Sequence, residues 1–403
     1  MRLTYNQPMA GAFAGVRMLD LSRLLPGPYC SLLFADLGAE VIKVEEPGRG
    51  DYARRTPPLW GESDIGAYFL LLNRNKKSIS IDLKTDAGKA IFRRLVRTAD
   101  VLLESFRPGV MDRLGLGWEA LRAENPGLVY CAISGYGQDG PYRNLVGHDI
   151  NYMGYAGALS VTGPREGPPL TPGVQVADLG GGALMAAFAI AAALHHRRDS
   201  GEGQLIDVSM TDGVVSWMIP HLAAFFATGR VPERGRERLN GGWPSYGVYE
   251  TADGGHLTLG ALEPQFWANF CRLVGREDLR PLQHAEGAAR DEVEATLRAL
   301  FRTRSRADWV ELLHQADVCA GPVLSLDEVV RDPQLRQRGL FVDVQHPKLG
   351  PVPQVAFPVQ MSATPGRVST PPPELGEHTD EVLRDLGYEA TAISGFRRDG
   401  VIA

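Results

Sequence analysis

The chain contains a strand-forming run, Val16-Arg17-Met18-Leu19-Asp20-Leu21, then a helical stretch from Tyr29 to Leu37, then Val41-Ile42-Lys43-Val44. A strand, a helix and a strand within about 30 residues form a βαβ unit with parallel strands. The alternation continues with expected strands at 78–83, 101–103 and 128–133, and expected helices at 87–98 and 118–124. We therefore expect an α/β fold with a mostly parallel sheet covered by helices.

The loop after the first strand argues against a dinucleotide cofactor. It reads Leu24-Leu25-Pro26-Gly27-Pro28, whereas a Rossmann dinucleotide site requires G-x-G-x-x-G at a helix start. Ligands of open α/β sheets bind beyond the carboxyl ends of the strands. The loops at that edge are therefore expected to hold the functional site.

The rest of the chain predicts an insertion into this domain. We expect residues 1–210 to form the first part of a large α/β domain and 211–245 a helix and linker, because this stretch becomes polar and rich in glycine. Residues 246–340 are predicted to form a smaller α+β domain. The frequent prolines after residue 347 suit a return linker, so 341–403 is assigned to that linker and the last part of the large domain.

Composition and charge exclude several classes of function. The chain has 403 residues, 44% of them hydrophobic and 22% charged, which is typical of a globular protein. The net charge of −6 is spread out and offers no basic field for nucleic acid and no polybasic stretch for a membrane. The longest apolar run, Ala183–Leu194, has the length of a core helix rather than of a membrane span.

The cysteines and the start of the chain predict a cytoplasmic location. The first fifteen residues fit neither a signal peptide nor a transit peptide. The four cysteines are Cys30, Cys131, Cys271 and Cys319. They lie far apart without paired spacing, which argues against a disulfide framework and a zinc site.

Two segments carry candidate proton-transfer groups beside glycine. They are Gly147-His148-Asp149-Ile150-Asn151-Tyr152 and Asp178-Leu179-Gly180-Gly181-Gly182. Imidazole and carboxyl groups together can deprotonate a carbon acid on one face and reprotonate it on the other. Each residue alone has a plainer interpretation, because a loop histidine is usually a structural hydrogen-bonding residue and Asp178 could be a helix N-cap.

Further motifs identify a family. From about Gly15 to Leu386 the chain resembles the class III CoA-transferase family, which includes formyl-CoA and carnitine CoA-transferases and α-methylacyl-CoA racemase. The segments that carry this resemblance are Ala35–Glu45, Asn73–Ser78, Arg107-Pro108-Gly109, Ser134-Gly135-Tyr136-Gly137, the glycine run after Asp178, and Gly201–Gln204.

The resemblance implies two possible chemistries. In the transferases the aspartate at position 178 would attack a thioester and form a mixed anhydride. In the racemases Asp178 and His148 would form an acid/base pair, and Glu263 of the segment Ala261–Phe266 would orient the imidazole. The 147–152 and 261–266 segments resemble the racemases, so we favour 1,1-proton transfer at the α-carbon of a 2-methylacyl-CoA. Residues 50–68 resemble the transferases, which remain the alternative, and a catalytically silent CoA-thioester binder is a third interpretation.

The resemblance also implies a binding site for the CoA moiety of the substrate, and no other cofactor is expected. Guanidinium groups suit phosphate, and backbone N–H groups at Gly180 and Gly181 are expected to stabilise the enolate oxygen, so that Gly180→Val should damage turnover more than folding. Glu46 departs from the family, which often has Arg there, and would repel a phosphate. The implied CoA-binding residues are Arg74, Arg107 and Arg113, with Ile81, Asp82, Leu83, Lys84, Ser134, Tyr136 and Gly147 along the cofactor.

The same resemblance implies a Rossmann-like large domain built from both chain ends, a smaller inserted domain and a homodimer of interlocked rings. In such a dimer the partner subunit's Glu263 would reach His148.

Two other sequence patterns do not indicate a function. His195-His196-Arg197-Arg198 ends an apolar helix where cations meet the helix dipole, so no metal is expected. Ser134 lacks the G-x-S-x-G elbow of a serine hydrolase.

Overall fold

The computed structural model describes residues 11–403 and divides the chain into two compact units. The first unit contains the described residues up to Met153, together with Val174–Trp217 and Pro333–Ala403. The second contains Gly154–Gly173 and Met218–Asp332. The first unit is therefore built from both ends of the chain.

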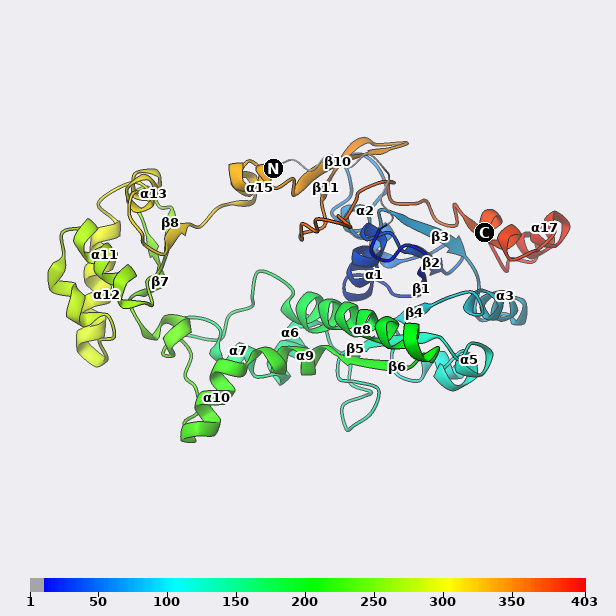
Figure 1. Ribbon diagram of the computed structural model, residues 1–403, viewed down its shortest axis with the longest axis horizontal. Coiled ribbons are helices and arrows are strands. Elements are labelled where there is room, and N and C mark those ends of the chain that lie inside the picture. Colours follow the sequence, from blue (N-terminus) through cyan, green and yellow to red (C-terminus); the bar gives the residue numbers. More distant parts are fainter. Residues whose placement is uncertain (1–10) are drawn as a thin grey trace. The chain divides into compact units, whose positions relative to one another are not determined.

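A six-stranded parallel sheet forms the centre of the first unit (Figure 1). Its strand order is β3-β2-β1-β4-β5-β6, the order of the Rossmann fold. The order reverses between β1 and β4, so the chain enters the sheet at its middle and leaves in both directions. The strands are β1 (Arg17–Asp20), β2 (Glu40–Glu45), β3 (Lys76–Ser80), β4 (Val101–Glu104), β5 (Val129–Ser134) and β6 (Leu205–Ser209).

Helices precede or follow most strands of this sheet. Helix α1 begins with Pro26 in its first turn, which suits proline because the N–H there has no partner within the helix. The helices of the first unit are α1 (Pro26–Asp36), η1 (Tyr52–Arg54), α2 (Ala67–Leu72), α3 (Asp86–Val96), α4 (Val110–Arg113), α5 (Trp118–Glu124), α6 (Asp149–Tyr155, ending just beyond the unit), η2 (Val176–Leu184), α8 (Met185–Ser200), α9 (Met210–Trp217), α15 (Pro333–Gln337), α16 (Thr379–Asp385) and α17 (Ala390–Arg398).

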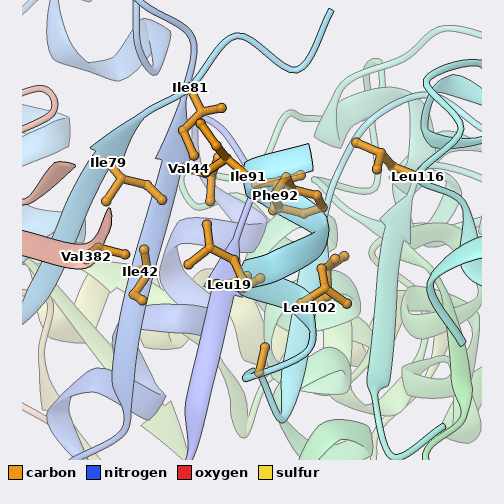
Figure 2. Packing of buried hydrophobic residues seen from close by; sticks show 14 of the residues in the cluster. Leu19, Ile42, Val44, Ile79, Ile81, Ile91, Phe92, Leu102, Leu116 and Val382 are labelled. Atoms are coloured by element: carbon orange, nitrogen blue, oxygen red, sulfur yellow. The ribbon is translucent and has the colours of Figure 1, made fainter. Parts of the chain in front are cut away.

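The largest hydrophobic core lies between one face of the sheet and helices from both chain ends. Figure 2 shows Leu19, Ile42 and Leu102 of the strands packed near Phe92 of α3 and Val382 of α16, and all are buried. The apolar residues of α3 recur at helical spacing, and they form the face that covers the sheet: Ile91, Phe92, Leu95 and Val96. Because α16 and α17 complete this core, the C-terminal segment belongs to the first unit.

A hairpin of β10 (Phe341–His346) and β11 (Gly350–Val355) packs on α2 through a small cluster of Leu70, Val344 and Val352. Gln354 of β11 accepts a hydrogen bond from Arg74, whose guanidinium also forms a buried ion pair with Asp36 of α1 at 2.6 Å. The hairpin and α1 therefore hold Arg74 from two sides.

The second unit is a smaller α+β structure. An antiparallel sheet in the order β7-β8-β9 packs against helices around the buried aromatic rings of Phe270, Phe301 and Trp309. Its elements are α7 (Ala158–Val161), α10 (Ile219–Thr228), η3 (Arg238–Gly242), β7 (Tyr246–Glu250), β8 (His256–Gly260), α11 (Pro264–Leu273), η4 (Glu277–Leu282), α12 (Gly287–Phe301), α13 (Arg306–His314), β9 (Ala320–Pro322) and α14 (Leu326–Val329).

The unit boundaries differ from those expected. Residues 154–173, assigned to the large domain by sequence, group with the second unit, as do residues 218–245 of the expected linker. The apolar run 183–194 is also part of a longer helix, because η2 and α8 continue as Val176–Ser200. By length and composition this 25-residue helix could span a membrane. Its buried glycines pack against α9, however, which is typical of a core helix.

Candidate functional site

A cavity of about 700 Å³ opens at the carboxyl ends of the parallel strands. Its walls include the loops after β1, β4 and β5, so it lies where the strand order reverses and where α/β sheets bind ligands. The ionisable side chains Arg23, Arg107, Arg143, His148 and Asp178 are among its lining residues. Three guanidinium groups face one carboxyl group, and the cavity therefore favours an anionic ligand.

Polar side chains of the 147–152 segment hold the loop that carries His148. The Asn151 side chain accepts a hydrogen bond from the His148 N–H at 3.0 Å, and the Tyr152 hydroxyl donates to the Gly147 carbonyl at 2.5 Å. Burial raises the pKa of Tyr152 to about 12, helped by the nearby Asp178 carboxylate, so the hydroxyl keeps its proton and remains a donor. The motif thus fixes the backbone of His148, whose side chain is exposed in the single chain.

The Tyr152 ring explains two glycines of the cavity wall. A Cβ at Gly135 would lie 2.3 Å from this ring, and a Cβ at Gly147 would lie 2.7 Å from it. Contacts below 3.0 Å require a neighbour to move. The 134–137 and 147–152 motifs therefore form one packed wall around Tyr152.

Asp178 lies in the first turn of η2, a π-helical stretch that continues into α8. Such wide turns often occur at functional sites. Burial and, to a smaller extent, the Asp149 carboxylate raise the pKa of Asp178 to about 6, and His148 opposes the shift. A carboxyl group with this pKa can take up and release a proton near neutral pH.

The glycines after Asp178 allow helix α9 to pack closely against η2. A Cβ at Gly180 would lie 1.7 Å from the Trp217 ring of α9, and one at Gly181 would lie 2.5 Å from the Met210 carbonyl oxygen. Gly180→Val should therefore damage folding as well as turnover, whereas the sequence predicted that turnover would suffer more than folding. The N–H groups of Ala177 and Asp178 are also occupied, because both donate to Asp149.

Several sequence-predicted CoA residues meet in the cavity. Arg107, Ser134, Tyr136 and Gly147 line it together with His148 and Asp178. The Ser134 hydroxyl accepts a hydrogen bond from the Gly137 N–H at 3.0 Å and so stabilises a turn of the wall.

Other predicted residues lie away from the cavity lining. Arg74 is buried in its pair with Asp36, and Ile81 is buried in the core and bridges to Ile402. Arg113, exposed at the end of α4, is not a lining residue either. The Arg74 guanidinium donates hydrogen bonds to two buried side chains, Asp36 and Gln354, and the structure thus gives it a structural role.

Asp82, Leu83 and Lys84 form a turn that does not line the cavity, and Leu83 of this turn packs against the core. Lys84 Nζ pairs with Glu46 at 2.7 Å, and the Asp82 side chain accepts a hydrogen bond from the Lys84 N–H. The hydrogen bond from Lys84 lowers the pKa of Glu46. The negative charge of Glu46, which was expected to repel a phosphate, is therefore balanced by Lys84, one of the predicted CoA-binding residues.

Sequence reasoning missed two of the cavity's arginines. Arg23 lies three residues after the end of β1, and its guanidinium lies over the rings of Tyr52 and Phe106 at 5.1 and 5.4 Å from their centroids. Its place at the carboxyl end of a central strand was a usable signal. Arg143 has no comparable signal in the sequence.

Glu263 lies in the second unit, where it is the exposed N-cap residue of α11 and is followed by Pro264. Its side chain makes no capping hydrogen bond. Within residues 11–403 no cluster of three or more His, Cys, Asp or Glu side chains could hold a metal ion.

The sheet order and the cavity define an α/β protein with an arginine-lined cavity at the switch point of a Rossmann-like sheet. Residues 13–379 match the family model described as CoA-transferase family III. The chain belongs to this family, which is enzymatic and contains both racemases and CoA-transferases.

Relatives of both kinds are similar to the chain over nearly its whole length. An alpha-methylacyl-CoA racemase of Homo sapiens is 36% identical over 97% of each chain. A succinate–glutarate CoA-transferase of Agrobacterium fabrum is 38% identical over 93% of this chain and 95% of the relative. A crystal structure of a CAIB/BAIF family protein from Brucella suis, 32% identical, superposes with a TM-score of 0.82 over 94% of this chain and all of that chain.

Proposed function

We propose that this protein is a 2-methylacyl-CoA racemase or epimerase. One observation carries the proposal: His148 and Asp178 line the same cavity, and the pKa of Asp178 is raised to about 6. An imidazole and a carboxyl group whose pKa is raised toward neutral are suited to exchange roles as base and acid. The cavity arginines suit the phosphates of a CoA thioester.

In the proposed reaction one of the two groups removes the α-proton of the thioester and leaves an enolate. The other group, protonated beforehand, returns its proton to the opposite face of the α-carbon. The C–H bond that breaks is replaced by one that forms, and the two side chains end with their protonation states exchanged. The chemistry is proton transfer alone and needs no cofactor beyond the CoA moiety of the substrate.

The same proposal includes a homodimer. His148 and Glu263 are both exposed in the single chain, although a catalytic imidazole normally has a partner that fixes its tautomer. We infer that the partner subunit's Glu263 supplies this contact. Activity should then fall on dilution in parallel with the dimer fraction measured by light scattering, and an active monomer would contradict this part of the proposal.

A CoA-transferase acting through Asp178 is the second candidate, and one observation favours it. Tyr52, within the transferase-like segment 50–68, lines the cavity beside the loops after β1 and β4. In this reaction the Asp178 carboxylate would attack the thioester carbonyl, forming a mixed anhydride and expelling the CoA thiolate. The thiolate would then attack the aspartyl carbonyl, releasing the donor acid and leaving an enzyme-bound CoA thioester, from which an acceptor acid takes CoA by the reverse steps.

One experiment separates the two candidates. A pure (R)- or (S)-2-methylacyl-CoA is incubated with the enzyme in D₂O without an acceptor acid, and the product is analysed by mass spectrometry and chiral chromatography. The racemase proposal expects uptake of one deuterium with loss of optical purity. His148→Ala should abolish the loss of optical purity and should retain deuterium uptake only from the enantiomer that Asp178 deprotonates. Absence of exchange, with CoA transfer once acids are added and its loss in Asp178→Ala, would establish the transferase.

A further inference from the structure

Asp149 connects the two candidate catalytic segments. Its Oδ1 atom accepts hydrogen bonds from the N–H groups of Ala177 at 2.7 Å and Asp178 at 2.9 Å. Asp149 follows His148 directly in the chain and is the first residue of α6. One carboxylate oxygen therefore ties the beginning of α6 to the beginning of η2, across 29 positions of sequence.

These bonds use the first N–H groups of a helix, which have no partner within it. A carboxylate is a strong acceptor at that position because the helix dipole favours negative charge there. The two bonds also affect where His148 and Asp178 lie relative to each other. His148 and Asp178 occupy fixed places in one cavity only if α6 and η2 keep their spacing, and the two bonds of Asp149 join these elements directly.

We propose that Asp149 is a positioning residue that sets the distance between His148 and Asp178 and keeps a negative charge beside Asp178. The inference rests on the proposed proton-transfer function of these two residues. Asp149 does not exchange protons with the substrate in this account. Asp149 acts by fixing the spacing between His148 and Asp178 and by placing a negative charge beside Asp178.

The charge of Asp149 has a separate effect from its hydrogen bonds. Burial is the main cause of the raised pKa of Asp178, and the Asp149 carboxylate adds to it. Among the described groups, the other residues in electrostatic contact with Asp178 are His148 and Tyr152, and Arg107 acts on Tyr152 in turn. Removing the Asp149 charge leaves these groups in place and should lower the pKa of Asp178.

Two substitutions separate the effects. Asp149→Asn keeps an oxygen that can accept both N–H groups but removes the charge, whereas Asp149→Ala removes both. Misplacing catalytic groups by about 1 Å can cost about 100-fold in rate. We expect Asp149→Ala to lose about 100-fold in kcat with little change in KM. Asp149→Asn should recover most of that loss. With the enantiomer that Asp178 deprotonates as substrate, the acid limb of its kcat/KM profile should move to lower pH.

Asp86→Asn is the matched control, because Asp86 is fully exposed in the first turn of α3 and carries the same charge. It should leave both kcat and the acid limb unchanged. Melting temperatures of all variants test whether a loss of rate is only a loss of folding. Equal rates for Asp149→Ala and wild type, or an acid limb that stays in place in Asp149→Asn, would overturn the inference.

A second measurement does not depend on activity. In protein labelled with ¹³C at the aspartate carboxyl carbon, the signal of Asp178 is identified by its loss in Asp178→Asn and titrated by NMR. The pKa of Asp178 should be lower in Asp149→Asn than in wild type. An unchanged pKa would refute the electrostatic role of Asp149 even in an active racemase. Absence of deuterium exchange in the wild type, by contrast, would refute the proposed function.

Discussion

Lys43 Nζ lies 2.8 Å from Asp51 Oδ2, and both side chains are fully buried. The lysine also donates a hydrogen bond to the Ser22 carbonyl, and the aspartate accepts one from the Leu24 N–H. Leu24 and its neighbour Arg23 line the cavity, as does Tyr52 beside Asp51. The buried ion pair therefore holds in place two segments of the cavity wall, the loop at Arg23 and Leu24 and the segment at Tyr52.

Lys43→Met should destabilise the protein strongly, because it leaves the Asp51 carboxylate buried without a cation. Breaking one partner of a buried pair costs about 3 to 5 kcal/mol. Urea unfolding measures the loss, and adding Asp51→Asn to Lys43→Met should restore part of it. Lys84→Met is the control, since its pair with Glu46 is exposed. Equal stability of the two lysine variants would contradict the structural role of Lys43.

Gly180→Ala should lower stability, because its Cβ would lie 1.7 Å from the Trp217 ring. Overpacking of this kind costs about 1 to 3 kcal/mol. Gly173→Ala is the control, since a Cβ there has no atom within 4 Å. Thermal unfolding compares the two. A Gly180→Ala protein as stable as Gly173→Ala, but inactive, would instead return Gly180 to a role in stabilising the enolate.

Ionised Asp178 should destabilise the folded state. Its folded pKa of about 6 exceeds the ordinary value of 3.8, so the folded protein binds this proton more tightly than the unfolded chain does. Stability contributed by the proton is present below about pH 4 and is lost as the pH rises to about 6. Asp178→Asn, which stays neutral, should be more stable than wild type by about 2 to 3 kcal/mol at pH 8 and nearly equal at pH 4. Urea unfolding at both pH values checks this, and a pH-independent difference would argue against the raised pKa.

Arg107→Ala should weaken binding of the CoA portion of the substrate, because Arg107 lines the cavity and Arg113 does not. A hydrogen bond between charged groups is worth about 1.5 to 3 kcal/mol, so KM for an acyl-CoA should rise about tenfold or more. KM for the corresponding N-acetylcysteamine thioester, which lacks the phosphates, should change little. A larger effect of Arg113→Ala than of Arg107→Ala would show that the phosphates bind elsewhere.

The parallel sheet could be predicted because its strands are local patterns. The expected strand at 101–103 is β4, and the expected helix at 87–98 is α3 with slightly different ends. The glycine-rich fingerprint was correctly judged absent, although the strand order is that of a Rossmann fold. Order depends on contacts between distant segments, and the resemblance supplied it where periodicity could not.

The composition of the site was harder to predict for the same reason. Arg74 belongs to a family motif, but its bonds to Asp36 and Gln354 join segments far apart in sequence. The glycines at 180 and 181 suggested close approach of a ligand, whereas helix α9 approaches them. Asp149 gave no signal beyond its motif, because its bonding partners are backbone N–H groups of a segment almost thirty residues away.

The central claim is that His148 and Asp178 act on opposite faces of one α-carbon. Each pure enantiomer of a 2-methylacyl-CoA can be incubated in D₂O with His148→Gln and with Asp178→Asn, and α-deuterium and optical purity are then measured. We predict that each variant exchanges the α-proton of one enantiomer only, a different one for each variant, and that neither variant racemises. Exchange of both enantiomers by the same variant, or unchanged racemisation in either variant, would contradict the two-base account.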